Sequence, residues 1–107
     1  MTDTLPPQSD VERELHHFLA EASRPMRPTD AYKQLAAVFH LSAQQLSLEI
    51  ENASGRENAW ENRVRQARRR LKDEGWLDGS VRGRWSLTLR GKGLASLRHS
   101  SPGDIGI

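Results

Sequence analysis

Apolar residues recur at helical spacing in the first part of the chain, and one stripe opens the pattern. Its members stand at i, i+4, i+7, i+8 and i+11: Val11, Leu15, Phe18, Leu19 and Ala22. This spacing predicts a helix over about residues 10–22. Ser9 and Glu12 have capping-box spacing at its start, and Pro25 and Pro28 prevent it from continuing.

Two further amphipathic patterns follow the prolines. The first predicts a helix over about residues 30–39, and its apolar stripe comprises Tyr32, Leu35, Ala36 and Phe39. Ser42 and Gln45 form another capping box, which predicts a short helix over about residues 43–50. Residues 51–57, ENASGRE, are mostly polar, so we expect a polar loop there.

The longest helical pattern covers residues 58–74 and ends at Gly75, the residue type that most often adopts the left-handed conformation after a helix. Two capping pairs fit its start: Ser54 with Glu57, and Asn58 with Glu61. We favour the second pair. One apolar stripe runs along this helix and is expected to face the core: Trp60, Val64, Ala67 and Leu71.

Two short apolar runs at residues 77–81 and 84–88 flank the pair Arg82-Gly83. Alternation in the second run and the turn-forming glycine predict a β-hairpin. Thr88 is expected to cap a last helix, in which Leu94 and Leu97 face inward. The predicted fold is therefore mainly α with a small β-hairpin, a winged helix-turn-helix. Its three-helix core comes from the first, second and fourth helices, and the hairpin is the wing.

Charge separates along the chain, although the net charge is only +2. Residues 1–54 carry 4 Lys or Arg and 8 Asp or Glu, a net charge of −4. Residues 55–98 carry 12 Lys or Arg and 5 Asp or Glu, a net charge of +7, and residues 99–107 carry only Asp104. Because a polyanion responds to local potential, this segregation favours nucleic acid as the partner.

The face of the 58–74 helix opposite the apolar stripe carries amides and arginines. Its members are Asn58, Asn62, Arg65, Gln66 and Arg69, with Arg63 and Arg70 along one edge. Arg can bind guanine O6 and N7, and Asn or Gln can bind adenine N6 and N7 in the same bidentate way. We therefore expect this recognition helix to enter the major groove of duplex DNA. The alternative is an ordinary solvated basic face.

The predicted wing, residues 79–84, carries Arg82 and Arg84 beside its glycine. Arginines at a wing tip suit the DNA backbone or the minor groove, whereas the alternative is a solubilising turn. Trp60 and Trp85 could stack on bases, but their positions on apolar stripes favour core packing.

No catalytic constellation is recognisable, so we expect a binding module that is not an enzyme and needs no cofactor or metal. The absence of cysteine excludes disulfides and thiolate metal sites. His16 and His17 are adjacent and the other histidines are isolated, without zinc-ligand spacing. Gly91-Lys92-Gly93 lacks the context of a phosphate loop, and we expect it to permit close approach at the start of the last helix. No apolar run is long enough for a membrane span.

A pattern in the second half resembles the N-terminal winged-helix domain of Mrr-like modified-DNA restriction endonucleases. The shared positions are an aromatic followed by Asn62-Arg63-Val64, then Ala67, Leu71, Gly75, Leu77, Gly83, Trp85, Thr88 and Gly91. The resemblance covers about residues 10–98. It implies a domain that binds DNA, in a family in which a separate C-terminal domain cuts it. A nuclease domain or subunit is thus an expected partner, besides double-stranded DNA.

Together these features divide the chain into a disordered leader (1–8), a winged-helix DNA-binding domain (9–98) and a flexible tail or linker (99–107). We expect a cytoplasmic, nucleoid-associated recognition module of a restriction or defence system, with modified DNA as a candidate target. Two alternatives stay open. One is a transcriptional regulator of the same fold, and the other is a protein-interaction winged helix that never touches DNA.

Overall fold

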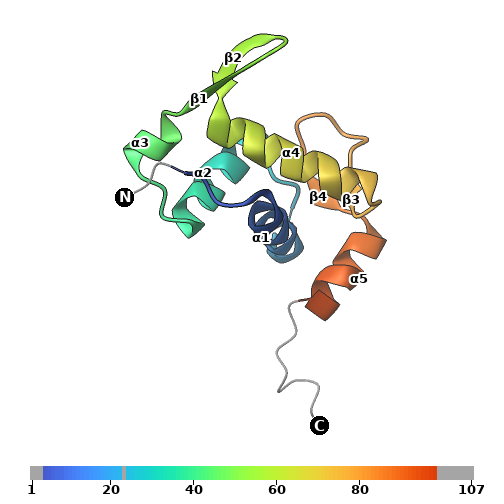
Figure 1. Cartoon of the computed structure of the whole chain (residues 1–107). Helices are drawn as coiled ribbons and strands as arrows, with labels where there is room; N and C mark the ends of the chain where they lie inside the picture. Colours follow the sequence, from blue (N-terminus) through green and yellow to red (C-terminus); the bar gives the residue numbers. More distant parts are fainter. Residues whose placement is uncertain (1–3, 23, 99–107) are drawn as a thin grey trace.

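The computed structural model describes residues 4–22 and 24–98, with side chains described up to residue 94. The chain is mainly helical with two short antiparallel hairpins, which agrees with the predicted class. The elements are α1 (Gln8–Glu21), α2 (Pro28–Val38), α3 (Ala43–Leu46), β1 (Glu49–Asn52), β2 (Gly55–Asn58), α4 (Ala59–Asp73), β3 (Leu77–Asp78), β4 (Ser86–Leu87) and α5 (Leu89–Arg98). In Figure 1, α4 lies across α1 and α2, the β1–β2 hairpin projects from its N-terminal end, and the β3–β4 loop rises beside it.

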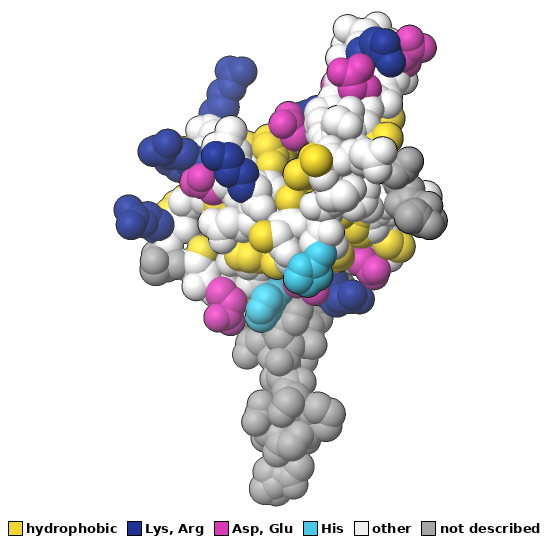
Figure 2. Space-filling view, turned by 90° about the vertical axis from the view of Figure 1, so that its left-hand side faces the viewer, with side chains coloured by type: hydrophobic (Ala, Val, Ile, Leu, Met, Phe, Trp, Pro, Cys, Tyr) yellow, Lys and Arg dark blue, Asp and Glu magenta, His cyan; other side chains and the backbone are white. Residues whose placement is uncertain are grey.

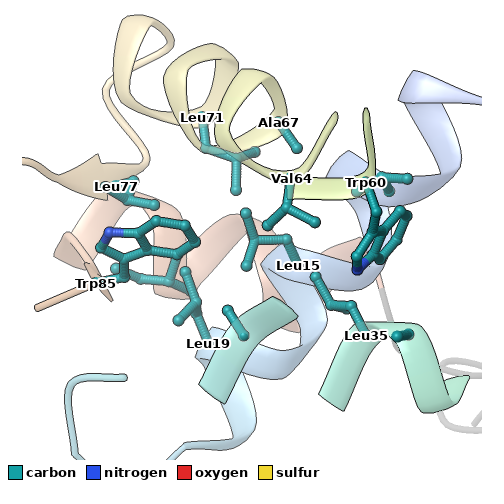
Figure 3. Packing of buried hydrophobic residues seen from close by; sticks show 13 residues of the cluster. Leu15, Leu19, Leu35, Trp60, Val64, Ala67, Leu71, Leu77 and Trp85 are labelled. Atoms are coloured by element: carbon teal, nitrogen blue, oxygen red, sulfur yellow. The ribbon is translucent and has the colours of Figure 1, made fainter. Parts of the chain in front are cut away.

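The apolar stripe of α4 lies in the core, as its spacing predicts. Trp60, Val64, Ala67 and Leu71 are each at most 2% exposed. Figure 3 shows them pointing from α4 toward apolar side chains of the helices and the hairpin opposite: Leu15, Leu19, Leu35, Leu77 and Trp85. The Trp60 indole N–H donates to the backbone oxygen of Tyr32 at 3.0 Å. Trp60 and Trp85 are therefore core residues, and stacking on bases is excluded for both.

Both ends of α4 follow from local sequence. Asn58 caps the start, because its Oδ1 accepts a hydrogen bond from the Glu61 backbone N–H at 3.0 Å. At the other end Gly75 has φ +83°, the left-handed conformation that glycine adopts without strain. The N–H of Trp76 then bonds the oxygen of Leu71 at 2.9 Å, which closes the last turn. The predicted boundaries and the favoured cap are confirmed.

The expectation of a helix to residue 50 and a loop over 51–57 is wrong. α3 ends at Leu46, and β1 pairs with β2 in register from Glu49↔Asn58 to Asn52↔Gly55. The turn is stabilised locally, because Asn52 Oδ1 accepts from the Ser54 N–H at 2.9 Å and Gly55 has φ +117°. All four β1 residues are exposed, so the strand lacks the apolar alternation that would predict it.

The beginning of the chain also differs from expectation. α1 begins at Gln8 after Pro7, and no side-chain cap forms, so Ser9 and Glu12 do not make the predicted capping box. Within the predicted leader, Leu5 packs against the core, and the backbone oxygen of Pro6 accepts a hydrogen bond from Arg63. Residues 1–3 of that leader and the 99–107 tail lie outside the described residues.

The β3–β4 hairpin is shorter than predicted. Leu77 pairs with Leu87 and Asp78 with Ser86, while residues 79–85 form a loop in which Gly83 has φ +74°. The Asp78 carboxylate accepts hydrogen bonds from the N–H and hydroxyl of Ser80, and these bonds lower its pKa. The Asp78–Ser80 hydrogen bonds lie directly after the second paired residue, where the strand ends.

A further bridge extends the sheet. The N–H groups of Met26 and Trp85 donate to each other's backbone oxygens at 2.9 and 2.8 Å. The segment before α2 therefore lies against the strand that ends the wing, an arrangement compatible with a winged helix. Thr88 caps α5 as expected, because its Oγ1 accepts from the Gly91 N–H at 3.0 Å. Leu94 is half-buried, and the side chain of Leu97 lies outside the described residues. No described helix is long and apolar enough to cross a membrane.

Candidate nucleic-acid interface

Some of the predicted contact residues of α4 make hydrogen bonds or ion pairs within the protein, whereas others are exposed without such partners among the described residues. Asn58 serves the fold. Besides capping α4, its Nδ2 donates to the backbone oxygen of Leu46 at 2.7 Å. This second bond fixes the end of α3 to the start of α4. We therefore assign Asn58 a structural role at the start of α4 rather than a contact with DNA.

Asn62 and Arg65 are held by a carboxylate of the β1–β2 hairpin. Glu57, on β2, accepts a hydrogen bond from Asn62 Nδ2 at 3.1 Å and forms a hydrogen-bonded ion pair with Arg65. Arg65 also donates to the Tyr32 hydroxyl at 3.3 Å and lies 3.7 Å from Glu61 Oε1. Hydrogen bonds from Asn52, Asn62 and Arg65, in that order, lower the pKa of Glu57. The hairpin thus fixes two of the predicted base-reading side chains.

Arg63 and Arg70 lie on the edge of α4 that faces the start of α1. Arg63 donates to the backbone oxygen of Pro6 and is half-buried. Arg70 is exposed and pairs with Glu74 one turn later, at 3.2 Å. An exposed i,i+4 pair of this kind contributes only about 0.3–0.5 kcal/mol, so DNA could displace it easily.

Gln66 and Arg69 remain as the free residues of the outward face. Both are exposed, and within the described part of the chain neither side chain makes a hydrogen bond or ion pair. They border a shallow hollow that α4 forms with α1, together with Gln8, Glu12, Arg70 and Asp73. The two acidic residues at its rim make this hollow less favourable for a phosphate than for a base edge.

The wing arginines point into different surroundings. Arg82 borders a groove between the wing, α4 and the start of α2, which Arg65 also lines. Arg84 borders another hollow, beside Arg24 and Arg27. Both side chains are exposed, and within the described residues neither makes an ion pair. The loop therefore carries one arginine on the side of α4 and one beside the hollow between α1 and α2.

Arg68 and Tyr32 border the same groove as Arg82, and the sequence pattern did not identify either as a site residue. The guanidinium carbon of Arg68 lies 5.6 Å from the centroid of the Trp85 ring, within the range of a cation–π contact. On a helical wheel Arg68 lies near the apolar stripe, so the sequence pattern placed it beside the core and gave no reason to assign it to an exposed site. Only the fold brings it beside a tryptophan of the wing.

The two elements that border this surface, α4 and the β1–β2 hairpin, differ in net charge. Figure 2 shows several Lys and Arg side chains projecting at the upper left of the view with Asp or Glu among them, while the hairpin at the upper right carries charges of both signs. The hairpin holds Glu49, Glu51 and Glu57 against Arg56, a net charge of −2. α4 carries six Lys or Arg against two Asp or Glu. Positive potential is therefore concentrated on α4 and the wing.

Removal of the Glu57 charge is expected to make stability depend less on pH. The folded-state pKa of Glu57 lies below its ordinary value of 4.5, so its stabilising effect is complete above that pH and is lost as the pH falls through the folded pKa. The difference in unfolding free energy between the wild type and Glu57→Gln should be constant above about pH 6 and shrink toward about pH 3. Urea titrations at a series of pH values measure it.

Glu51→Gln is the matched control, because it removes a carboxylate of the same hairpin that lies outside the Glu57 network. It should leave the pH dependence unchanged. A Glu57→Gln difference that did not vary with pH would show that the hydrogen bonds and the ion pair of Glu57 do not lower its pKa in the folded protein.

Comparison with known proteins adds a family to this geometry. The family profile described as Mrr N-terminal domain matches residues 12–96, which include α4, both hairpins and the groove beside the wing. Comparisons with curated proteins and with solved structures gave no match. The match covers well over half of the chain and confirms the resemblance in the α4 and wing motifs. The chain therefore belongs to the family of Mrr N-terminal domains.

Proposed function

We propose that this chain is a double-stranded DNA-binding winged-helix module of an Mrr-like restriction system. In this proposal α4 enters the major groove, and the β3–β4 wing contacts the backbone or the minor groove. The family match supports a module of such a system. The observation that carries the DNA interface is the free, exposed pair Gln66 and Arg69 on the face of α4 opposite its buried stripe.

The dimensions of α4 suit this role. Its 15 residues span about 22 Å, and a helix of about 10–12 Å diameter fits the major groove, which is about 12 Å wide. Gln66 and Arg69 are neighbours on the helix surface, so they would meet adjacent base edges. Asn62 lies on the same face, and its link to Glu57 limits the entropy that it would lose on binding.

Titration of the domain with mixed-sequence duplex DNA at low salt tests the proposal. The logarithm of the binding constant should fall linearly with the logarithm of salt concentration, because lysines and arginines displace counterions from phosphates. Methylated and unmethylated duplexes compared at one salt concentration would show whether the module reads a modification.

The proposal assigns no catalytic role to this chain. We propose that a separate nuclease domain or subunit cuts the DNA, and that the module acts in the cytoplasm, at the nucleoid.

Arg82→Ala is expected to weaken binding to all sequences by a similar factor. Arg82 lies on the wing and would contact phosphate, which carries no sequence information. The slope of the salt dependence should become shallower by about 1 for the lost contact. Fluorescence anisotropy with several duplexes over a salt series measures both quantities. If Arg82→Ala instead lowered the affinity for some duplex sequences much more than for others, Arg82 would contact a base edge.

A protein-interaction role is a second candidate that one observation favours. The β1–β2 hairpin projects from the body of the domain with a net charge of −2, and its Ile50 is 36% exposed (Figure 1). An acidic projection suits a basic protein surface better than DNA. If the domain failed to bind DNA but captured the nuclease subunit of its system through this hairpin, the second role would replace the first.

A further inference from the structure

A basic groove lies between the start of α2, α4 and the wing. It has a volume of about 570 Å³, and the residues that line it include Pro28, Tyr32, Arg65, Arg68, Arg82 and Trp85. The groove is not part of the outward face formed by Gln66 and Arg69, which borders the hollow on the α1 side. Its ligand is therefore a separate question from base reading.

The aromatic wall of the groove is already covered. Trp85 is only 4% exposed, the Arg68 guanidinium lies over its ring, and the Tyr32 ring meets it edge-on with centroids 6.2 Å apart. An extruded base needs a free ring face on which to stack. Because the tryptophan offers none, the groove is poorly suited to a flipped nucleotide.

The electrostatics of the groove favour an anion. Three arginines border it, and among the described residues that line it there is no Asp or Glu. The other two hollows of the basic region differ in this respect, because one contains Glu12 and Asp73 and the other Glu21 and Asp30. Among these three hollows, this groove is therefore the one that brings no carboxylate of the described residues against a bound phosphate.

The charge of Arg68 is not neutralised by a carboxylate of the described residues. Its guanidinium makes no ion pair there, and its buried Nε has no hydrogen-bond partner among them. Arg65, in contrast, is already bonded to Glu57 and Tyr32. The Trp85 ring positions the Arg68 guanidinium, so binding an anion would cost little side-chain entropy.

We propose that this groove binds one phosphate of the DNA backbone. Arg68 would contact it from α4, and Arg82 would contact it from the wing. The inference rests on the proposed function, because the DNA strand must run between the recognition helix and the wing to reach the groove. Arg68 is then a sequence-independent anchor that fixes how deeply α4 sits in the major groove.

Arg68→Gln tests the proposal through the salt dependence of duplex binding. The slope of log K against log salt should become shallower by about 0.9, and the affinity at about 0.1 M salt should fall on the order of tenfold, while the ratio of affinities for two sequences stays constant. Arg68→Lys should restore the slope, because lysine still neutralises the phosphate. Lys92→Gln, which removes an exposed charge from α5, is the matched control and should leave the slope unchanged.

A second arm uses the DNA as the variable and protects against a folding defect in the Arg68 variant. A duplex in which single phosphates are replaced in turn by neutral methylphosphonates should bind the wild type less tightly when one particular phosphate is replaced. Arg68→Gln and Arg82→Gln should each be insensitive at that same position. Near-ultraviolet circular dichroism of each variant reports whether the Trp85 environment is retained.

The outcomes separate this proposal from the function on which it rests. A steep salt dependence in the wild type with an unchanged slope in both Arg68→Gln and Arg82→Gln would overturn the phosphate site and leave DNA binding intact. Tighter binding to a mismatched duplex that depended on Arg68 would also overturn it, in favour of an extruded base. A wild type that bound no DNA at all would remove both the proposed function and this inference.

Discussion

Arg69→Glu is expected to lower the affinity for duplex DNA by about a hundredfold or more at about 0.1 M salt. A bidentate contact to a base is worth about 1–3 kcal/mol, and the new carboxylate adds repulsion from the phosphates. Arg69 is exposed and within the described residues makes no ion pair, so its reversal should leave the fold unchanged. Fluorescence anisotropy at several salt concentrations measures the effect, and a thermal melt confirms folding.

Lys92→Glu is the control, because it makes the same change of charge on α5, which lies below α4 in Figure 1 and contributes no residue to the hollow that Arg69 borders. It should reduce the affinity only slightly. If both reversals weakened binding equally, net charge would explain the result and the α4 face would have no special role. If neither mattered, the proposed interface would be wrong.

Gly91→Ala is expected to lower the free energy of unfolding by about 3 kcal/mol or more, the upper range for overpacking a rigid site. A Cβ atom at Gly91 would lie 2.0 Å from the backbone oxygen of Trp76, and backbone cannot move aside as a flexible side chain can. The oxygen of Gly91 also lies 2.8 Å from Nε2 of the buried His16. The variant must therefore shift α5 away from both contacts. Urea unfolding followed by tryptophan fluorescence measures the loss.

Gly93→Ala is a matched control two residues later on α5. A Cβ there would meet nothing within 4 Å, so the substitution should stabilise the helix by about 0.5–1 kcal/mol through propensity alone. Opposite signs at the two glycines would confirm that Gly91 is required for close approach, as its sequence context suggested. A mild effect at Gly91 would show that α5 can move without cost.

The sequence predicted the helix of residues 58–74 correctly, because the features that define it depend on residues three or four positions apart. The apolar stripe of α4, the Asn58 cap and the Gly75 end each involve spacings of three or four residues, and the structure confirms all of them. The β1–β2 hairpin was missed for the complementary reason. All four β1 residues are exposed, so no apolar alternation distinguishes that strand from a loop, although Asn52 and Gly55 could have indicated its turn.

The site was predictable only in part, because side-chain partners depend on the missed hairpin and on tertiary contacts. Asn62 and Arg65 lie on the predicted face, but Glu57 could hold them only once β2 was placed beside α4. Arg68 and Trp85 are far apart in sequence, and helical position alone assigns Arg68 to the edge of the core. The proposed interface therefore depends on fewer residues than the sequence indicated. We expect Gln66 and Arg69 to contact bases, and Arg68 and Arg82 to contact phosphate.

The measurement that tests the account most directly is the binding of two duplexes of different sequence to the wild type and to the double variant Gln66→Ala/Arg69→Ala over a salt series. The account predicts that the wild type binds at low salt with a steep linear dependence on log salt. The double variant should lose sequence discrimination while it keeps most of that slope, since Arg68 and Arg82 still grip the backbone. Absence of wild-type binding at low salt, or unchanged affinity and discrimination in the double variant, would contradict the assignment of α4 as the recognition helix.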